Sequence, residues 1–320
     1  MIRTIFGRQR ILPFISVWDT TKAGVSSSNQ VKLPLVSGFP YKVDWGDGVI
    51  NIINSTSDSN LTHTYISTGV YTIKILNAVR GFIFNNGGDK LKIKEILDWG
   101  NFAIDTSAFY GCSNLILSNV KGVPIINTLQ SVFRGCTAIT VIKGSVNWNT
   151  SNVVSLNACF WQCTNFNDAG VSNWNTSSCT NFSYIFYFCS FFNQPLNWSF
   201  SSASTVQGIF FYAIRYNQDV SSWNLSGVGN CSDIFNGAAS FIQPISMWVF
   251  NKNAILTNLM LNKSNYPTNL MDDVLIKIES CVVGTGRTNS NKNLQFGGGR
   301  TSASNTAVAS LLANGWIGFS

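Results

Sequence analysis

The sequence predicts an α/β repeat solenoid, preceded by an all-β sandwich module and followed by an α/β capping segment. Three observations predict this organisation. Tryptophan recurs about every 25 residues, phenylalanine recurs in phase with it, and the segments on either side lack the repeat. A period of 20 to 50 residues is the signature of stacked repeat architectures. The expected divisions are an N-terminal arm (1–12), a β-sandwich (13–98), the repeat solenoid (99–266) and the capping segment (267–320).

The two aromatic series keep a constant offset from each other along the sequence. Neighbours in the tryptophan series are 24 to 26 residues apart: Trp148, Trp174, Trp198, Trp223 and Trp248. Neighbours in the second series, whose members are called ladder residues here, are 24 to 27 residues apart: Phe109, Phe133, Phe160, Phe186, Phe210, Phe235 and Met260. Where both occur, the tryptophan precedes the ladder residue by twelve positions.

Each repeat unit is expected to hold one short helix and one short strand. In the unit around Phe186, the residues seven, four and one before the ladder residue and three after it are apolar. On a helical wheel they form one stripe, which predicts a helix of two to three turns over 179–189. Glycine two positions after the ladder residue, as in Gly111, Gly135 and Gly237, is a plausible helix stop. The stretch before each tryptophan alternates briefly and predicts a short strand.

Cysteines recur three positions after the ladder residue, at Cys112, Cys136, Cys163 and Cys189. Later units have Ala213 and Ala238 there. Replacement by alanine favours small buried side chains over metal ligands or disulfides. We therefore expect no metal and no cofactor, with a zinc site or disulfides as the alternatives.

The segment before the repeats alternates like antiparallel strands around the turn Asp44-Trp45-Gly46-Asp47-Gly48. The chain's one histidine, His63, is expected to lie in a strand and hydrogen-bond this turn, the alternative being a catalytic base. Asp44 and Asp47 are expected to form the turn, and calcium binding is the alternative.

The segment after the repeats is expected to cover the last apolar layer. A helix is predicted from Thr268, and a second one from Ser304 to Asn314, stopped by Gly315. Extended stretches are expected from Asn293 and from Trp316.

The composition and charge of the chain argue against several classes of function. Only 11% of the residues are charged, against about 25% in an ordinary domain. The net charge is +7, but no Lys/Arg run exceeds two residues, so no nucleic-acid partner is expected. Without an apolar run of about 18 residues, no membrane insertion is expected. Met1 to Trp18 makes a poor secretory signal, so we expect no removed leader.

Catalysis is not expected either. Between Asn101 and Tyr266 the acidic residues are only Asp105, Asp168, Asp219 and Asp233, and no sequence cluster supplies a facing carboxylate pair. With a single histidine as well, the sequence shows no catalytic set, and we expect a protein that is not an enzyme.

The repeats resemble a known family. The segments Phe166 to Trp174, Phe192-Asn-Gln-Pro-Leu-Asn-Trp198 and Tyr216-Asn-Gln-Asp-Val-Ser-Ser-Trp223 resemble the leucine-rich-like repeats of BspA-type bacterial surface proteins. Such repeats occur in mycoplasma lipoproteins and in bacteriophage particle proteins. The Trp-Gly-Asp-Gly turn with the later His-Thr-Tyr resembles the polycystic-kidney-type immunoglobulin-like module. Such modules generally serve as binding or spacer elements.

This resemblance implies a non-enzymatic structural and binding protein. The expected setting is the exterior or tail of a bacteriophage particle, where the protein contacts the host surface. The alternative is a bacterial cell-surface adhesin. Expected partners are other virion proteins, a host-surface glycan or protein, and further copies in a homo-oligomer.

Two candidate contact regions follow from the pattern. Arg3, Arg8 and Arg10 are candidates for particle attachment, with a disordered terminus as the alternative. In a helical frame, the residue after each ladder residue faces outward, and Tyr184 lies on the same side. The alternative is that these side chains are tucked between units. The candidate binding face consists of Tyr110, Arg134, Trp161, Tyr184, Tyr187 and Phe211, followed by Asn236 in the next unit.

Overall fold

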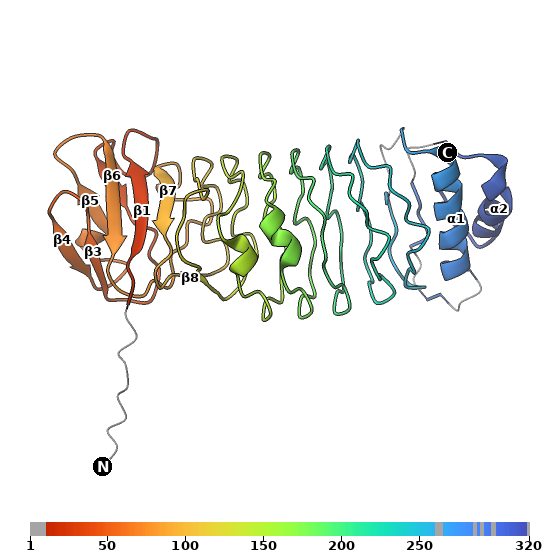
Figure 1. Cartoon of the computed structure of the whole chain (residues 1–320), viewed down its shortest axis with the longest axis horizontal. Helices are drawn as coiled ribbons and strands as arrows, with labels where there is room; N and C mark the ends of the chain where they lie inside the picture. The colour runs from red at the N-terminus through yellow and green to blue at the C-terminus, as the bar shows by residue number, and fades with distance from the viewer. Residues whose placement is uncertain (1–10, 260–264, 284–286, 289–290, 296–298, 319–320) are drawn as a thin grey trace, which may run out of the picture.

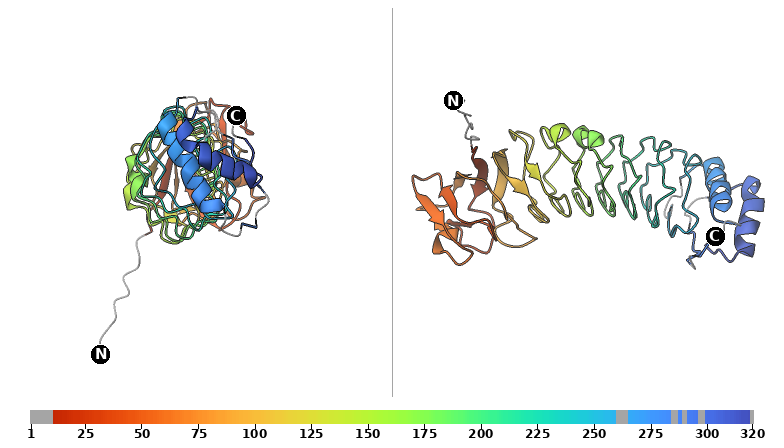
Figure 2. Two further views of the ribbon diagram at one scale, coloured as in Figure 1. Left: turned by 90° about the vertical axis from the view of Figure 1, so that its right-hand side faces the viewer. Right: turned by 90° about the horizontal axis from the view of Figure 1, so that it is seen from below.

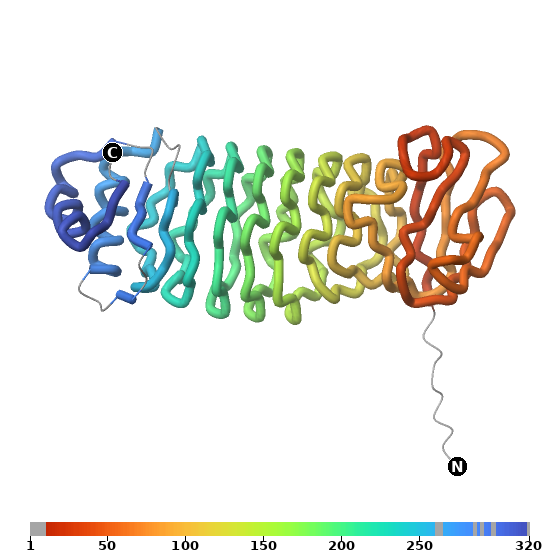
Figure 3. Tube along the Cα trace, turned by 180° about the vertical axis from the view of Figure 1, so that it is seen from behind, coloured from red at the N-terminus to blue at the C-terminus, as the bar shows by residue number. Residues whose placement is uncertain are grey.

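The molecule is elongated, with β-sheets at one end, a row of stacked repeat units in the middle and helices at the other end (Figures 1 and 2). The computed structural model describes residues 11–259, 265–283, 287–288, 291–295 and 299–318. Seen from behind, the chain advances unit by unit from the sheets to the helices (Figure 3). Met260, Arg3, Arg8 and Arg10 lie outside the described residues.

The N-terminal region holds two antiparallel sheets. The first has the strand order β4-β3-β6-β1-β7, and the second pairs β2 with β5. In β1, Phe14, Ser16 and Trp18 point into the core, as the alternating burial shows. The elements of this region are β1 (Phe14–Asp19), β2 (Gln30–Lys32), β3 (Tyr41–Asp44), β4 (Ile50–Ile53), η1 (Ser59–Leu61), β5 (Thr62–Thr64), β6 (Val70–Ile75) and β7 (Ile93–Asp98).

A buried ion pair pins the loop before β2. The Lys92 ammonium lies 3.7 Å from the Asp89 carboxylate, and both side chains are fully buried. Lys92 Nζ also donates to the carbonyl oxygens of Ser26, Ser27 and Gln30. Asp89 in turn accepts from the amides of Ser26 and Lys32. Every polar group of the pair therefore has a partner, as burial requires.

The last strand of the sheet also begins the stack of repeat units. β7 pairs antiparallel with β1 and makes parallel bridges to the next coil, from Glu95 to Ile116 and from Asp98 to Lys121. Beyond it, β8 (Ala103–Ile104) and β9 (Ile125–Ile126) are parallel. The buried side chains of the sheets and of the units form one continuous core.

The predicted α/β repeat solenoid is wrong. Residues 127–259 contain no α-helix and no β-strand, only turns, isolated bridges and the 3₁₀ helices η2 (Ser145–Asn147) and η3 (Ala169–Asn173). The described residues hold two α-helices, both after the repeats, and the larger sheet is antiparallel. Neighbouring units are joined instead by single parallel bridges: Ser155 to Asn181, Asn181 to Thr205, Thr205 to Asn230, and Asn230 to Ile255.

Backbone conformation explains why the helices do not form. The residues two before and two after the ladder residue adopt positive φ, which a right-handed helix does not contain. Around Phe186, for example, φ is 59° at Tyr184 and 57° at Phe188. The amides of Tyr184 and Phe186 then donate to carbonyl oxygens of the next unit, at 2.8 and 3.1 Å, rather than to residues four positions earlier.

Three columns of aromatic rings fill the interior of the units. Ladder rings stack at centroid distances of 5.7 to 5.9 Å, almost parallel, from Phe109 to Phe235. A second column contains the tryptophans, with Trp148 and Trp174 5.8 Å apart. A third column contains Phe166, Phe192, Tyr216, Phe241 and Tyr266, with centroids 6.0 to 6.3 Å apart. Such offset stacking is a favourable arrangement for aromatic pairs.

Two helices cover the far end of the stack (Figure 1). Both begin close to where the sequence predicts them: α1 (Thr268–Val282) and α2 (Asn305–Ala313), with η4 (Ser302–Ser304) before the latter. α1 buries Met271, Val274 and Ile278. Asn293 makes a parallel bridge to Ile317. Among the described helices, none has the length and apolar character needed to span a bilayer.

Candidate binding surface

A row of aromatic side chains and one arginine runs along the outside of five successive units. We call it the aromatic stripe, and it consists of Tyr110, Arg134, Trp161, Tyr184, Tyr187, Phe188, Phe211 and Tyr212. All eight side chains are half-buried: each is partly exposed and also packed against its neighbours. The six predicted residues are therefore brought together. The expectation for Asn236 is wrong, because this residue is only 4% exposed.

Arg134 lies between two rings at the N-terminal end of the stripe. Its guanidinium carbon is 4.8 Å from the ring centroid of Tyr110 and 4.3 Å from that of Trp161. These are cation–π distances, and together the two contacts restrict the guanidinium on both sides. In the described part of the chain no acidic group pairs with it, and its Nε is buried without a hydrogen-bond acceptor.

The remaining rings of the stripe contact one another in tilted, edge-on and stacked pairs. Trp161 and Tyr187 have centroids 4.1 Å apart, and Tyr187 and Phe211 are 4.6 Å apart with planes inclined by 7°. Phe188 and Tyr212 stack in parallel at 4.9 Å. In these two parallel pairs, each ring covers one face of its partner. The edge of an aromatic ring carries positive partial charge.

Two glycines make room for the rings, at the positions equivalent to Tyr184 and Tyr212 in the next unit. A Cβ atom on Gly208 would lie 2.7 Å from the Tyr184 ring, and one on Gly237 would lie 2.7 Å from the Tyr212 ring. Sequence reasoning missed Phe188 and Tyr212 because it treated the second position after the ladder residue as a helix stop. Gly237, one unit after Tyr212, is the sequence signal that could have indicated a ring packed at this position.

The hydroxyls of Tyr184 and Tyr187 remain protonated at neutral pH. Burial raises the pKa of Tyr184 above its ordinary value, and the nearby Asp233 carboxylate adds to the increase. The same two causes, in the same order, raise the pKa of Tyr187. Both hydroxyls can therefore donate a hydrogen bond to a ligand.

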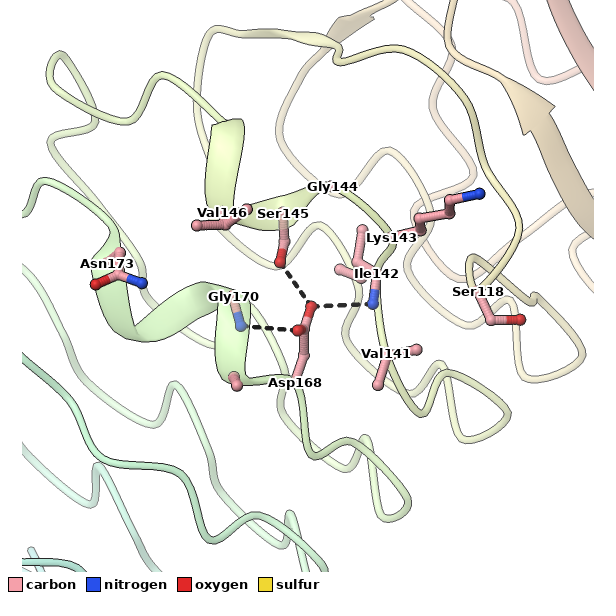
Figure 4. Close-up of a pocket in the computed structure, with 11 residues that line it drawn as sticks. Ser118, Val141, Ile142, Lys143, Gly144, Ser145, Val146, Asp168, Gly170 and Asn173 are labelled. Carbon is pink, nitrogen blue, oxygen red and sulfur yellow. Dashed lines mark hydrogen bonds between the residues drawn. The ribbon is translucent and has the colours of Figure 1, made fainter.

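A second candidate, a surface hollow of about 470 Å³, lies beside Asp168 and is lined by Lys143 and Gly144 (Figure 4). The Asp168 carboxylate accepts from the amide of Ile142 at 3.0 Å, the Ser145 hydroxyl at 2.7 Å and the amide of Gly170 at 2.8 Å. Asp168 therefore caps η3 and ties two units together. Its two oxygens therefore already accept three hydrogen bonds from the protein itself.

His63 has the structural contacts expected of it. It lies in β5, its Nε2 is 2.7 Å from Asp47 Oδ2, and its ring stacks on Trp45 at 4.7 Å. Asp44 and Asp47 each accept a backbone amide within the turn, from Gly46 and Val49. The part of the chain that the structure describes contains no group of three His, Cys, Asp or Glu side chains arranged as a metal site.

The recurring cysteines are buried in the core as free thiols. Cys136, Cys163 and Cys189 each place Sγ within 3.1 Å of a carbonyl oxygen in the unit before. Burial raises the pKa of these thiols well above the ordinary value. They therefore fill space and bridge units in their neutral form, and they are not reactive thiolates.

The fold and the stripe define an elongated repeat protein with an accessible aromatic surface. Residues 127–248 and 192–270 match a family model described as "Mycoplasma protein of unknown function, DUF285". The match is consistent with the resemblance to BspA-type surface repeats. Neither the curated proteins nor the solved structures include a match to this chain.

Proposed function

We propose that this chain is a non-enzymatic structural and binding protein that attaches to an exterior partner through the aromatic stripe. The observation that carries the proposal is the stripe itself. Eight neighbouring side chains, seven of them aromatic, are partly exposed along five units. Contiguous exposed apolar surface in a folded protein usually marks an interaction site.

The proposed setting is the exterior or tail of a bacteriophage particle, where the stripe contacts the host surface. The second candidate is a bacterial cell-surface adhesin, the setting of the BspA-type surface proteins that the repeats resemble. Both settings require the same exposed surface. Immunogold labelling of purified particles and of intact cells distinguishes the two settings. The first predicts label on the phage particles, and the second predicts label on the bacterial cell surface.

The attachment role is tested with the double variant Trp161→Ala, Tyr187→Ala. These two rings are at the centre of the stripe and contact each other. The variant should fold and yet lose attachment to host cells in a pull-down assay. Phe191→Ala is the matched control, because Phe191 is a 42% exposed aromatic residue outside the stripe. Wild-type attachment by the double variant would refute the proposal.

A further inference from the structure

We infer that the Arg134 end of the aromatic stripe binds an oxyanion of an acidic surface polysaccharide. This inference rests on the proposed attachment function and names the chemistry of its ligand. The Arg134 side chain has no ion-pair partner in the described part of the structure, and its Nε is buried. A guanidinium without an ion-pair partner can hydrogen-bond an anionic ligand through its terminal N–H groups.

The guanidinium is held in place before any ligand arrives. Tyr110 and Trp161 contact it at 4.8 and 4.3 Å, so its ring-facing surfaces are occupied while its edge keeps the N–H donors. That edge is the fork that recognises carboxylate, sulfate or phosphate through two parallel hydrogen bonds. Holding the side chain in position reduces the entropy lost on binding.

The surrounding charge also favours an anion. From 106 to 167 the chain carries Lys121, Arg134 and Lys143 but no Asp or Glu. Asp233, the acidic residue near the tyrosines, lies toward the opposite end, and its carboxylate accepts from Asn236. An oxyanion is therefore expected at Arg134, and uncharged hydroxyls are expected near Tyr184 and Tyr187.

The repetition of the stripe indicates a polymer. Two ring pairs of the stripe are stacked, so each of these four rings has one face covered, and ring edges and tyrosine O–H groups are available as contacts. Tyrosine hydroxyls occur in three of the five units of the stripe, at Tyr110, at Tyr184 and Tyr187, and at Tyr212. A polysaccharide with acidic groups and hydroxyls along its length matches such a surface better than a single small anion does.

The test measures binding of the purified full chain to defined polymers by biolayer interferometry. The probes are polygalacturonate for carboxylates, dextran sulfate for sulfates, neutral dextran, and poly-glutamate as an acidic peptide. We expect binding to one or both acidic polysaccharides and much weaker binding to dextran. Equal binding to dextran, binding to poly-glutamate alone, or binding to none of the probes would overturn the inference.

Variants separate a specific site from overall positive charge. Arg134→Gln should weaken polysaccharide binding by about tenfold or more, because charge-assisted hydrogen bonds are lost. Arg134→Lys should also bind more weakly, since it keeps the charge but not the planar fork. Lys252→Gln removes the same charge from an exposed site outside the stripe and should bind as the wild type does.

Thermal unfolding of each variant checks that the fold is intact. Wild-type binding by either Arg134 variant, or equal losses for Arg134→Gln and Lys252→Gln, would show that no such site exists. The outcome is separable from the proposed attachment function. Suppose that the purified chain binds no acidic polysaccharide but the Trp161→Ala, Tyr187→Ala variant loses attachment to host cells. The proposed attachment function is then supported, and only the oxyanion site is refuted.

Discussion

At the residue scale, the few charged side chains of this protein act mainly as fixed structural contacts. Asp89 and Lys92 are completely buried and hold the loop before β2, and Asp168 joins two units through three hydrogen bonds. Asp47 holds the turn together with His63. In a chain with 11% charged residues, each of these contacts contributes to a particular loop or turn.

Replacing Lys92 by methionine should strongly destabilise the protein. The change leaves the Asp89 carboxylate buried without its counter-ion, which typically costs about 3 to 5 kcal/mol. Denaturant unfolding of the full chain measures the loss. Lys22→Met is the control, because Lys22 pairs with Asp19 at the surface, where an ion pair contributes about 0 to 1 kcal/mol. Similar effects for the two variants would contradict the structural role of the pair.

The Asp47 turn should make stability depend on pH in the acid range. Burial opposes ionisation of Asp47, but hydrogen bonds from His63 and from the Val49 amide outweigh it and lower the pKa of the carboxyl. A lowered folded-state pKa stabilises above the unfolded value of about 3.9, and this contribution is lost as the pH falls through the folded-state pKa.

The melting temperatures of wild type and Asp47→Asn should therefore differ at about pH 5 and converge at about pH 2. Asp273→Asn, an exposed change in α1, should follow the wild-type profile throughout. A constant difference between wild type and Asp47→Asn across this range would show that ionisation of Asp47 does not stabilise the turn.

At the element scale, the repeat unit is shaped by two positive-φ residues, one two positions before the ladder residue and one two positions after it. Ser107, Ser131 and Ala158 occupy the first position, and Gly111 and Gly135 occupy the second. The second position also accepts residues other than glycine, as Phe188 and Tyr212 show. Positive φ directs backbone amides toward the next unit, and so the unit cannot close a helix.

Two glycines at the second position should respond differently to alanine. A Cβ on Gly135 would come no closer than 3.7 Å to the backbone of Gly111, so Gly135→Ala should cost only the left-handed strain of about 1 to 2 kcal/mol. A Cβ on Gly237 would also lie 2.7 Å from the Tyr212 ring, so Gly237→Ala should cost more. Chemical denaturation of both variants compares them, and equal losses would contradict the packing of Tyr212.

At the scale of the whole molecule, three aromatic columns run through neighbouring units and join them in one core. Phe186 stacks on Phe160 and Phe210 at 5.8 and 5.9 Å and contacts Phe192 at 3.8 Å. Because each unit packs on the units before and after it, the stack is expected to tolerate the loss of a whole unit better than a shift of the columns.

Deletions should reveal this dependence on register. Removing residues 187–210 joins Phe186 to Phe211 and keeps all three columns aligned, whereas removing residues 187–198 displaces them by half a unit. The longer deletion should therefore unfold at the higher temperature in calorimetry. Phe186→Ala, which empties one position of a column, should cost about 3 to 5 kcal/mol. Equal damage by the two deletions would contradict stacking in register.

By itself, the sequence determined the repeat period, the identity of the core residues and six of the eight residues of the stripe. These depend on spacing, and apolar rings 24 to 27 residues apart meet whenever successive units stack. It also located both terminal helices, whose starts and stops are local signals.

Only the tertiary structure decided the backbone of the unit. The apolar positions around Phe186 fit a helical stripe, and Cys179, Phe182, Ile185 and Cys189 are indeed buried. However, the same side chains can be buried by turns whose amides donate to the neighbouring unit. Hydrogen bonds between units do not depend on local spacing, and so the periodicity alone could not distinguish the turns from a helix.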